Sequence, residues 1–176
     1  MHPALCLSIL FSNDFQRSQS AGMTVPQSEA ESRVSLFVQA SRESGLRLTH
    51  QRLEVAREIA RSDVHPDVEA IYCAVRERVP TISLDTVYRT VGTLERLGLI
   101  NRVDVMAGPA RYDANLEPHH HFICVRCGLI RDLPSTSYEG LEVPEAATNL
   151  GEVESITVQL RGLCKECREQ AIRIRP

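Results

Sequence analysis

The sequence predicts an α+β protein with two small domains, an N-terminal winged helix-turn-helix domain and a C-terminal α/β domain that carries a zinc site of four cysteines. In the first part of the chain, several short helical patterns are followed by the pattern of a β-hairpin, which is the element order of a winged helix. In the second part, two CxxC pairs stand within short strand patterns, as in zinc-binding domains.

Length and charge exclude several classes of protein. The 176 residues suffice for one ordinary domain or two small ones, and a hydrophobic content of 43% supports a real core. The formal net charge of −3 excludes a polybasic protein that coats nucleic acid by charge alone, but it allows a local basic face. No apolar run approaches the ~20 residues of a membrane span. We therefore expect a cytoplasmic protein with no membrane partner.

Residues 1–28 are predicted to be an N-terminal extension outside the folded domains. Their apolar stretch, Ala4–Phe11, lacks the basic segment that precedes the core of a secretory signal. Met23 offers a second possible start, so residues 1–22 are expected to be a disordered tail or the product of a misassigned start.

Four helices are predicted for the winged-helix domain, residues 29–107. The first helix is expected to begin near Glu29 and to end near Gly45, and Thr49 is expected to cap the second. Pro66 is expected in the first turn of the third helix. The fourth helix is expected over 84–97, between its cap Ser83 and Gly98. A hairpin follows, with strands over 99–105 and 110–113. We expect a hinge at 108–113.

The second domain is predicted over residues 114–176, with three strands and two helices. Alternating or apolar runs predict the strands, and helical spacing predicts the helices. The strands are expected at 121–125, 129–133 and 153–160, and the helices at 142–149 and 165–174.

The six cysteines are of two kinds, because Cys6 and Cys73 are isolated and the others form the two CxxC pairs. A CxxC turn brings two sulfurs together, and four thiolates in a tetrahedron are preferred ligands of a structural Zn²⁺. A redox dithiol is the alternative, but it needs a single CxxC at a strand–helix junction. We therefore predict structural zinc bound by Cys124, Cys127, Cys164 and Cys167.

Histidines gather close to the boundary between the predicted domains. Alternate side chains of a strand share a face, so His119 and His121 can bind one metal while His120 points away and is expected to be exposed. With one more imidazole and two carboxylates, they would form an N/O site that suits Fe²⁺ or Mn²⁺. The candidate ligands are His65, Asp113, His119, His121 and Asp132. The alternative is a surface run of histidines with no ligand role.

Four motifs lie between Val34 and Cys167. They are GLRLTHQR at 45–52, His65–Pro66, SLDTVYRT at 83–90 and HHHFICVRCG at 119–128. Together they resemble the ferric uptake regulator family of metal-dependent repressors. The resemblance implies a winged-helix domain that binds double-stranded DNA, a C-terminal domain that forms a homodimer, and a regulatory metal between them. It implies no enzymatic activity.

Within the family, the peroxide-sensing repressors have the most similar regulatory site. The resemblance assigns Fe²⁺ or Mn²⁺ to the five candidate ligands, and Asp at both carboxylate positions favours peroxide sensing over iron sensing. It implies that bound Fe²⁺ reacts with H₂O₂ and that His65 and His119 are oxidised, whereas Mn²⁺ supports DNA binding without this chemistry. Residues 153–160 contain no histidine, so the third metal site of many iron sensors is predicted to be absent.

The fourth helix is the predicted recognition helix, because the first half of this helix carries side chains suited to a major groove. These are Thr86, Tyr88, Arg89 and Thr90, with Arg47 and Arg52 as candidate phosphate or minor-groove contacts. A two-fold dimer implies an inverted-repeat operator, and the resemblance implies an A/T-rich one. The alternatives are an iron, manganese or zinc uptake repressor, a metalloenzyme, and a zinc-ribbon module without DNA binding.

Overall fold

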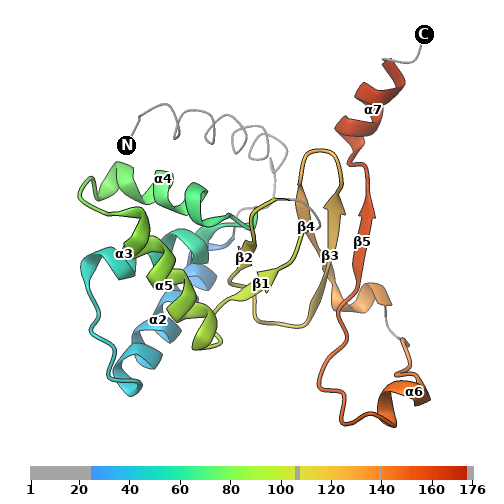
Figure 1. The fold of residues 1–176 in the computed structure, drawn as a ribbon, viewed down its shortest axis with the longest axis horizontal. Helices are drawn as coiled ribbons and strands as arrows, with labels where there is room; N and C mark the ends of the chain where they lie inside the picture. The colour runs from blue at the N-terminus through green and yellow to red at the C-terminus, as the bar shows by residue number, and fades with distance from the viewer. Residues whose placement is uncertain (1–24, 106–107, 139, 174–176) are drawn as a thin grey trace. The chain divides into compact units, whose positions relative to one another are not determined.

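The structure, a computed structural model, describes residues 25–105, 108–138 and 140–173 (Figure 1). The chain divides into two compact units, Met1–Leu116 and Glu117–Pro176. The prediction for residues 1–22 falls outside the described residues, and helix α2 already begins at Gln27, inside the predicted extension. Across the described part of the chain, no helix combines the length and the apolar character needed to cross a bilayer.

Four helices build most of the first unit: α2 (Gln27–Glu43), α3 (His50–Arg61), α4 (Val68–Arg78) and α5 (Leu84–Arg96). The predicted caps of α3 and α5 are confirmed, because the Thr49 hydroxyl accepts the Arg52 amide and the Ser83 hydroxyl accepts the Thr86 amide. The prediction of Pro66 in the first turn of α4 is wrong. The helix begins later because the Asp67 carboxylate is its N-cap and accepts the amide hydrogen of Ala70 at 2.8 Å.

The helices of the first unit pack around one apolar core. On α5 the buried residues are spaced i, i+3, i+4 and i+7, which places them on one face of the helix. They are Val87, Thr90, Val91 and Leu94. This face packs with buried residues of the other helices, such as Phe37, Ile59 and Ile71. The opposite face of α5 does not take part in this core and is available to contact other molecules.

A β-hairpin completes the first unit, with β1 (Asn101–Val103) antiparallel to β2 (Arg111–Asp113). Helices followed by this hairpin confirm the winged-helix prediction. The segment predicted to be a hinge instead contributes β2 to this unit. The reason is burial, since Tyr112 and Ala114 belong to the core of the helices. The division of the chain falls later, between Leu116 and Glu117.

An ion-pair network around the buried Glu54 joins α3 to α4. Glu54, only 7% exposed, accepts hydrogen bonds from Arg57 Nη1 at 2.6 Å and from Arg78 Nε at 3.0 Å. Arg78 also donates to Glu58 at 2.7 Å. Burial by itself raises the pKa of the Glu54 carboxyl, but the two arginines outweigh burial and hold this pKa below its ordinary value. The network therefore stabilises the fold while Glu54 is ionised.

Replacing Glu54 by glutamine is expected to lower the free energy of unfolding at neutral pH by about 1–3 kcal/mol, because Arg57 and Arg78 lose their hydrogen bonds to a charged acceptor that is nearly buried. The folded-state pKa of Glu54 is depressed, so its contribution is present above the unfolded-state value and lost as pH falls through the folded-state value. Urea unfolding at neutral pH and near pH 4 measures this. Glu58→Gln, at a more exposed carboxylate, is the control and should cost less. Equal losses in both variants would contradict the prediction.

The second unit contains a three-stranded sheet of order β4-β3-β5. The central strand β3 (His119–Cys124) runs antiparallel to β4 (Ile130–Pro134) and parallel to β5 (Gln159–Gly162). A 3₁₀ turn, Ser135–Tyr138, and a short helix α6 (Glu145–Thr148) separate β4 from β5, and α7 (Lys165–Arg173) follows β5. This mixed α/β unit confirms the predicted class of the second domain.

Two predictions for the second unit are wrong. The strand predicted over 153–160 pairs in the ladder only from Gln159 onward, and Val153 and Ile156 before it are 39% and 40% exposed. His120, predicted to be exposed, is only 6% exposed. Its Nδ1 accepts the Val158 amide hydrogen at 3.2 Å, and its ring lies edge-on to Tyr138. The connection before β5 covers this face of β3, which strand alternation alone does not reveal.

Candidate metal centres

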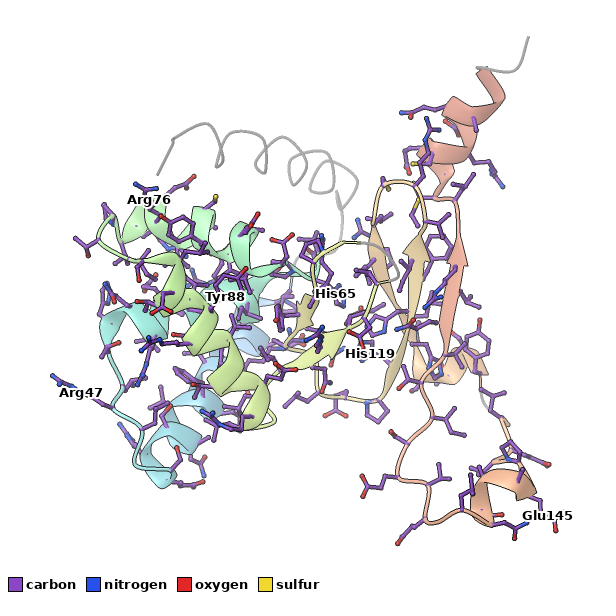
Figure 2. The ribbon with its side chains drawn as sticks, viewed as in Figure 1. Arg47, His65, Arg76, Tyr88, His119 and Glu145 are labelled. Atoms are coloured by element: carbon purple, nitrogen blue, oxygen red, sulfur yellow. The ribbon has the colours of Figure 1, made fainter. Side chains whose placement is uncertain are left out.

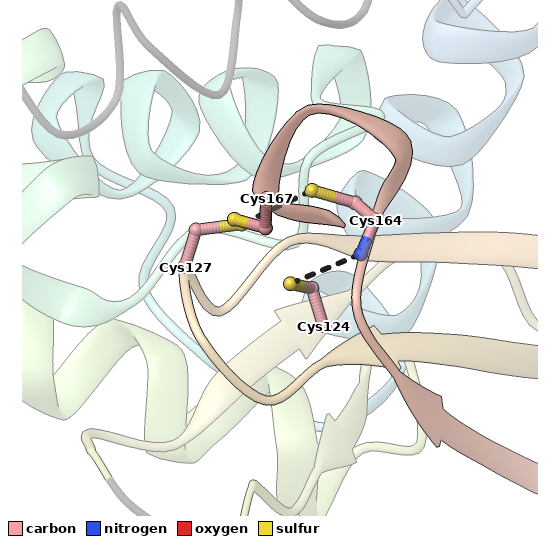
Figure 3. A group of neighbouring side chains, drawn as sticks. All are labelled: Cys124, Cys127, Cys164 and Cys167. Atoms are coloured by element: carbon pink, nitrogen blue, oxygen red, sulfur yellow. Dashed lines mark hydrogen bonds between the residues drawn. The ribbon is translucent and has the colours of Figure 1, made fainter. Parts of the chain in front are cut away.

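Four cysteine sulfurs of the second unit lie within 4.8 Å of one another (Figure 3). Cys124 ends β3, Cys127 lies in the following turn, Cys164 follows β5, and Cys167 lies in the first turn of α7. The Sγ atoms of Cys127 and Cys164 are 3.8 Å apart. Zn–S bonds of about 2.3 Å in a tetrahedron place sulfurs about 3.8 Å apart, so the arrangement fits one Zn²⁺.

Local backbone geometry brings these sulfurs together. Gly128 has φ +71°, a left-handed conformation that favours glycine, and its amide donates to the Cys124 carbonyl oxygen at 2.9 Å. This closes the first turn. The Arg126 guanidinium then donates to the Cys167 carbonyl oxygen at 3.0 Å and so ties the first turn to α7. The sequence spacing predicted each turn, but not this link between them.

The thiols have strongly divergent pKa values. At Cys124, burial favours the neutral thiol, but backbone amides led by that of Cys164 outweigh it and lower the pKa to about 6. At Cys127, burial and the sulfurs of Cys124 and Cys167 raise the pKa to about 11. Burial likewise raises the pKa of Cys164 well above its ordinary value. A divalent cation between the sulfurs would favour the thiolates of Cys127 and Cys164, which burial disfavours.

In the first unit, two of the predicted ligands face each other. His65 Nε2 lies 3.7 Å from Asp113 Oδ2, and both residues are buried. The other carboxylate oxygen, Asp113 Oδ1, accepts the Asn115 amide hydrogen at 2.7 Å. This hydrogen bond fixes the carboxylate so that Oδ2 points to the imidazole, which is how outer contacts commonly orient metal ligands.

The main chain of His65 adopts a conformation that is rare for a residue with a side chain. Among the described residues other than glycine, His65 alone has a positive φ, +49°. Such a conformation costs about 1–3 kcal/mol and persists where surrounding structure enforces it. The residue before a proline is additionally disfavoured in helical conformations. The structure around the loop before α4 therefore holds the main chain of His65 in this left-handed conformation.

In the second unit, three further predicted ligands converge. His119 and His121 project from the same face of β3, and their Nε2 atoms are 2.9 Å apart. Asp132, opposite His121 in the register with β4, places Oδ1 at 3.7 Å from His119 Nε2 and 3.8 Å from His121 Nε2. Alternation along one strand and one cross-strand pair therefore assemble two imidazoles and a carboxylate.

The hydrogen bonds of His119 assign its tautomer. Its Nδ1 lies 2.7 Å from the Glu117 carbonyl oxygen, and a carbonyl oxygen only accepts, so Nδ1 carries the proton. In the neutral ring, Nε2 then presents a lone pair toward His121 and Asp132. A lone pair, a second imidazole nitrogen and a carboxylate oxygen at this spacing fit a divalent cation. The Glu117 and Asn115 contacts are made by the main chain, so no side-chain signal predicts them.

The side chains predicted to contact DNA differ in exposure. Tyr88 lies on α5 (Figure 2) and is 53% exposed. The exposed Arg89 side chain pairs with Asp85 at 2.9 Å. Thr90 is only 2% exposed and donates its hydroxyl hydrogen to the Thr86 carbonyl oxygen, so its prediction as a contact is wrong. It lies on the core face of α5. Thr86 bonds to the Ser83 hydroxyl, and Arg52 donates to the carbonyl oxygen of exposed Arg47.

Residues 43–161 match the Ferric uptake regulator family. The chain belongs to this family. It is 30% identical over 129 residues to the peroxide-responsive repressor PerR of Staphylococcus epidermidis, covering 73% of this chain and 86% of that protein. Ferric uptake regulators are transcription regulators and not enzymes, and they bind DNA operators as dimers.

Solved structures of several metal-uptake and peroxide stress regulators are also similar. The Helicobacter pylori ferric uptake regulator Fur has a TM-score of 0.68 at 26% identity and covers 79% of this chain and 93% of its own. The Campylobacter jejuni peroxide stress regulator has a TM-score of 0.59 at 31% identity, covering 74% and 98%. A zinc-bound manganese uptake regulator reaches 0.59 at 33%, covering 72% and 96%. The chain is thus a metal-dependent transcriptional regulator with a four-cysteine site.

Proposed function

We propose that this protein is a peroxide-responsive repressor that binds an A/T-rich inverted-repeat operator as a homodimer when its regulatory metal is present. The observation that carries the proposal is the donor chemistry of the ligands, three imidazoles with two carboxylates that are both aspartate. PerR among the relatives supports the same branch. Structural Zn²⁺ in the four-cysteine site would hold β3, β5 and α7 together.

We propose that His65 and Asp113 of the first unit bind the same ion as His119, His121 and Asp132 of the second. A metal switches DNA binding only if it binds the DNA-competent conformation more tightly than the other conformations. An ion with ligands from both units meets this condition, because it is bound fully only when the winged-helix unit has one orientation. Fe²⁺ and Mn²⁺ suit such an N/O set.

Peroxide sensing follows from the reactivity of iron next to imidazole ligands. Bound Fe²⁺ would supply the electron transfer that activates H₂O₂ beside these ligands. In the net reaction, one oxygen atom of H₂O₂ enters an imidazole C–H carbon, the ring loses two electrons, and the second oxygen leaves as water. The oxidised ring binds metal less well, so the two units lose their common ion. Mn²⁺ would support DNA binding without this oxidation.

Treatment with Fe²⁺ and H₂O₂ is expected to add one oxygen atom to the peptides that contain His65 or His119, and treatment with Mn²⁺ and H₂O₂ is expected to leave them unchanged. Peptide mass spectrometry measures both. The exposed His50 is an internal control, because non-specific oxidation would modify it as well. Equal modification of His50, or no modification of the ligand peptides, would reject peroxide sensing.

DNA recognition is proposed through the exposed face of α5. Tyr88 and Thr86 can contact thymine methyl groups, and Arg89 can exchange its exposed pair with Asp85 for a phosphate or a guanine. Arg47 and Arg52 are proposed to contact phosphates or a minor groove. An electrophoretic mobility shift with and without Mn²⁺ tests this directly. A DNA affinity that does not depend on metal would contradict it.

The second candidate is an iron, manganese or zinc uptake repressor. The similarity to a manganese uptake regulator and to the Helicobacter pylori ferric uptake regulator favours it. The two candidates differ in the result of the oxidation experiment. An uptake repressor would bind DNA according to the supplied metal and would not gain oxygen at its ligand histidines.

A further inference from the structure

We infer that Arg111 is a positioning residue for the regulatory metal, because it holds the strained main chain of His65 in place. Arg111 lies on β2, and its side chain is 11% exposed. Its Nε donates to the His65 carbonyl oxygen, and its Nη2 donates to the Val64 carbonyl oxygen at 3.3 Å. Neither contact involves a metal ligand atom, so Arg111 would act through the main chain.

Two further contacts fasten the same loop to β2. Arg111 Nη1 lies 3.8 Å from Asp67 Oδ2, while Asp67 Oδ1 caps α4. The Tyr112 amide donates to the Pro66 carbonyl oxygen at 3.0 Å. Residues 64–67 are therefore fixed to residues 111 and 112 over their whole length. The next residue of β2 is Asp113, the carboxylate that faces His65.

The left-handed conformation of His65 shows why these contacts matter. A non-glycine residue with φ +49° before a proline relaxes unless its neighbours enforce that conformation. Hydrogen bonds to two successive carbonyl groups, at 64 and 65, fix the peptide planes on either side of the His65 α-carbon. The ring direction follows from that backbone, so Arg111 sets the position of His65 relative to Asp113.

An arginine is suited to this role for geometric reasons. Its planar guanidinium presents several N–H donors in fixed directions, which allows it to contact two carbonyl groups and a carboxylate at once. A lysine ammonium carries the same charge but lacks the fork. A glutamine removes the charge and has too short a reach. The two substitutions therefore separate charge from geometry.

Charge and geometry predict opposite signs for the metal affinity. A cationic side chain close to the ligands repels a divalent ion, so loss of its charge alone would tighten metal binding. Loss of the positioning contacts would weaken it, since contacts behind the ligands typically change metal affinity by about 10–100-fold. If removal of the positive charge of Arg111 weakens metal binding, the positioning contacts explain the result and charge repulsion does not.

The experiment measures Mn²⁺ affinity by isothermal titration calorimetry on zinc-loaded protein, together with the visible spectrum of bound Co²⁺. Arg111→Gln is expected to weaken Mn²⁺ binding by about 10–100-fold and to change the Co²⁺ spectrum. Arg111→Lys is expected to be intermediate. Arg102→Gln, at an exposed arginine of the paired strand, is the matched control and should leave both unchanged.

The inference rests on the proposed function, and a His65→Ala variant separates the two. If His65→Ala binds Mn²⁺ as the wild type does, the proposed regulatory site itself fails. If His65→Ala loses Mn²⁺ but Arg111→Gln binds it equally or more tightly, only the positioning role fails. Circular dichroism and zinc content verify folding. If Arg111→Gln does not fold, Arg111→Lys decides, and an unchanged affinity and spectrum in that variant overturn the inference.

Discussion

Replacing Cys164 by serine is expected to abolish zinc binding and to unfold residues 117–176. Cys164 is buried, and its amide donates to the Cys124 sulfur at 3.3 Å. Structural zinc contributes about 10–16 kcal/mol of apparent folding free energy in zinc-finger peptides. A typical domain has a net stability of about 5–15 kcal/mol, so loss of the metal exceeds what the small three-stranded sheet can compensate.

The experiment needs three measurements on the Cys164→Ser variant. Zinc content by atomic absorption should fall to zero, far-ultraviolet circular dichroism should lose strand signal, and size-exclusion chromatography should show loss of the dimer. Leu163→Ser is the matched control, because it places the same hydroxyl on the adjacent, 42% exposed residue. A Cys164→Ser protein that retains zinc and a cooperative unfolding transition would refute the structural role of the site.

Replacing His119 by alanine is expected to abolish metal-dependent DNA binding while zinc content and the dimer remain unchanged. The loss removes one ligand of the proposed ion and also the imidazole whose Nδ1 proton is held by the Glu117 carbonyl oxygen. Without this ligand, the metal no longer binds the DNA-competent orientation more tightly than the other orientations. The expected result is DNA affinity equal to that of the metal-free wild type, measured by fluorescence anisotropy over a Mn²⁺ titration.

A neighbouring histidine provides the control for His119→Ala. His120 lies on the other face of β3 and accepts the Val158 amide, so His120→Asn keeps an acceptor without touching the ligand face. This variant is expected to lose some stability and to retain its metal response. If His119→Ala binds the operator with unchanged metal dependence, the proposal of a common ion is wrong. If His120→Asn also loses the response, the effect of His119 reflects folding.

Local patterns in the sequence predicted the features that depend on near neighbours. Thr49 and Ser83 cap their helices because each hydroxyl meets an amide three residues later, whatever the rest of the chain does. The CxxC spacing brings sulfurs together within one turn for the same reason. His119 and His121 share a face because side chains alternate along any strand. These features follow from the main-chain geometry of a few consecutive residues.

Predictions failed where burial from distant residues decided the outcome. The residue type and position of Thr90 suit a DNA contact, but Thr90 lies on the face of α5 that packs against the core of the helices. Pro66 is a different case, because the cap of α4 is Asp67, its neighbour in sequence, which accepts the Ala70 amide hydrogen. The strand β5 begins only at Gln159, and the amide of the preceding Val158 donates to the His120 side chain. The residues that decide the burial of Thr90 and the start of β5 are distant in sequence.

The sequence by itself determined the family, the two-unit organisation, the four cysteines and the identity of the candidate ligands, since these depend on residue type and on local spacing. Only the tertiary structure decided which side chains are exposed, where the first unit ends, and how His65 is held. The physical reason is that packing selects one face of each element, and a strained residue such as His65 persists only through contacts from a strand more than forty residues away along the chain.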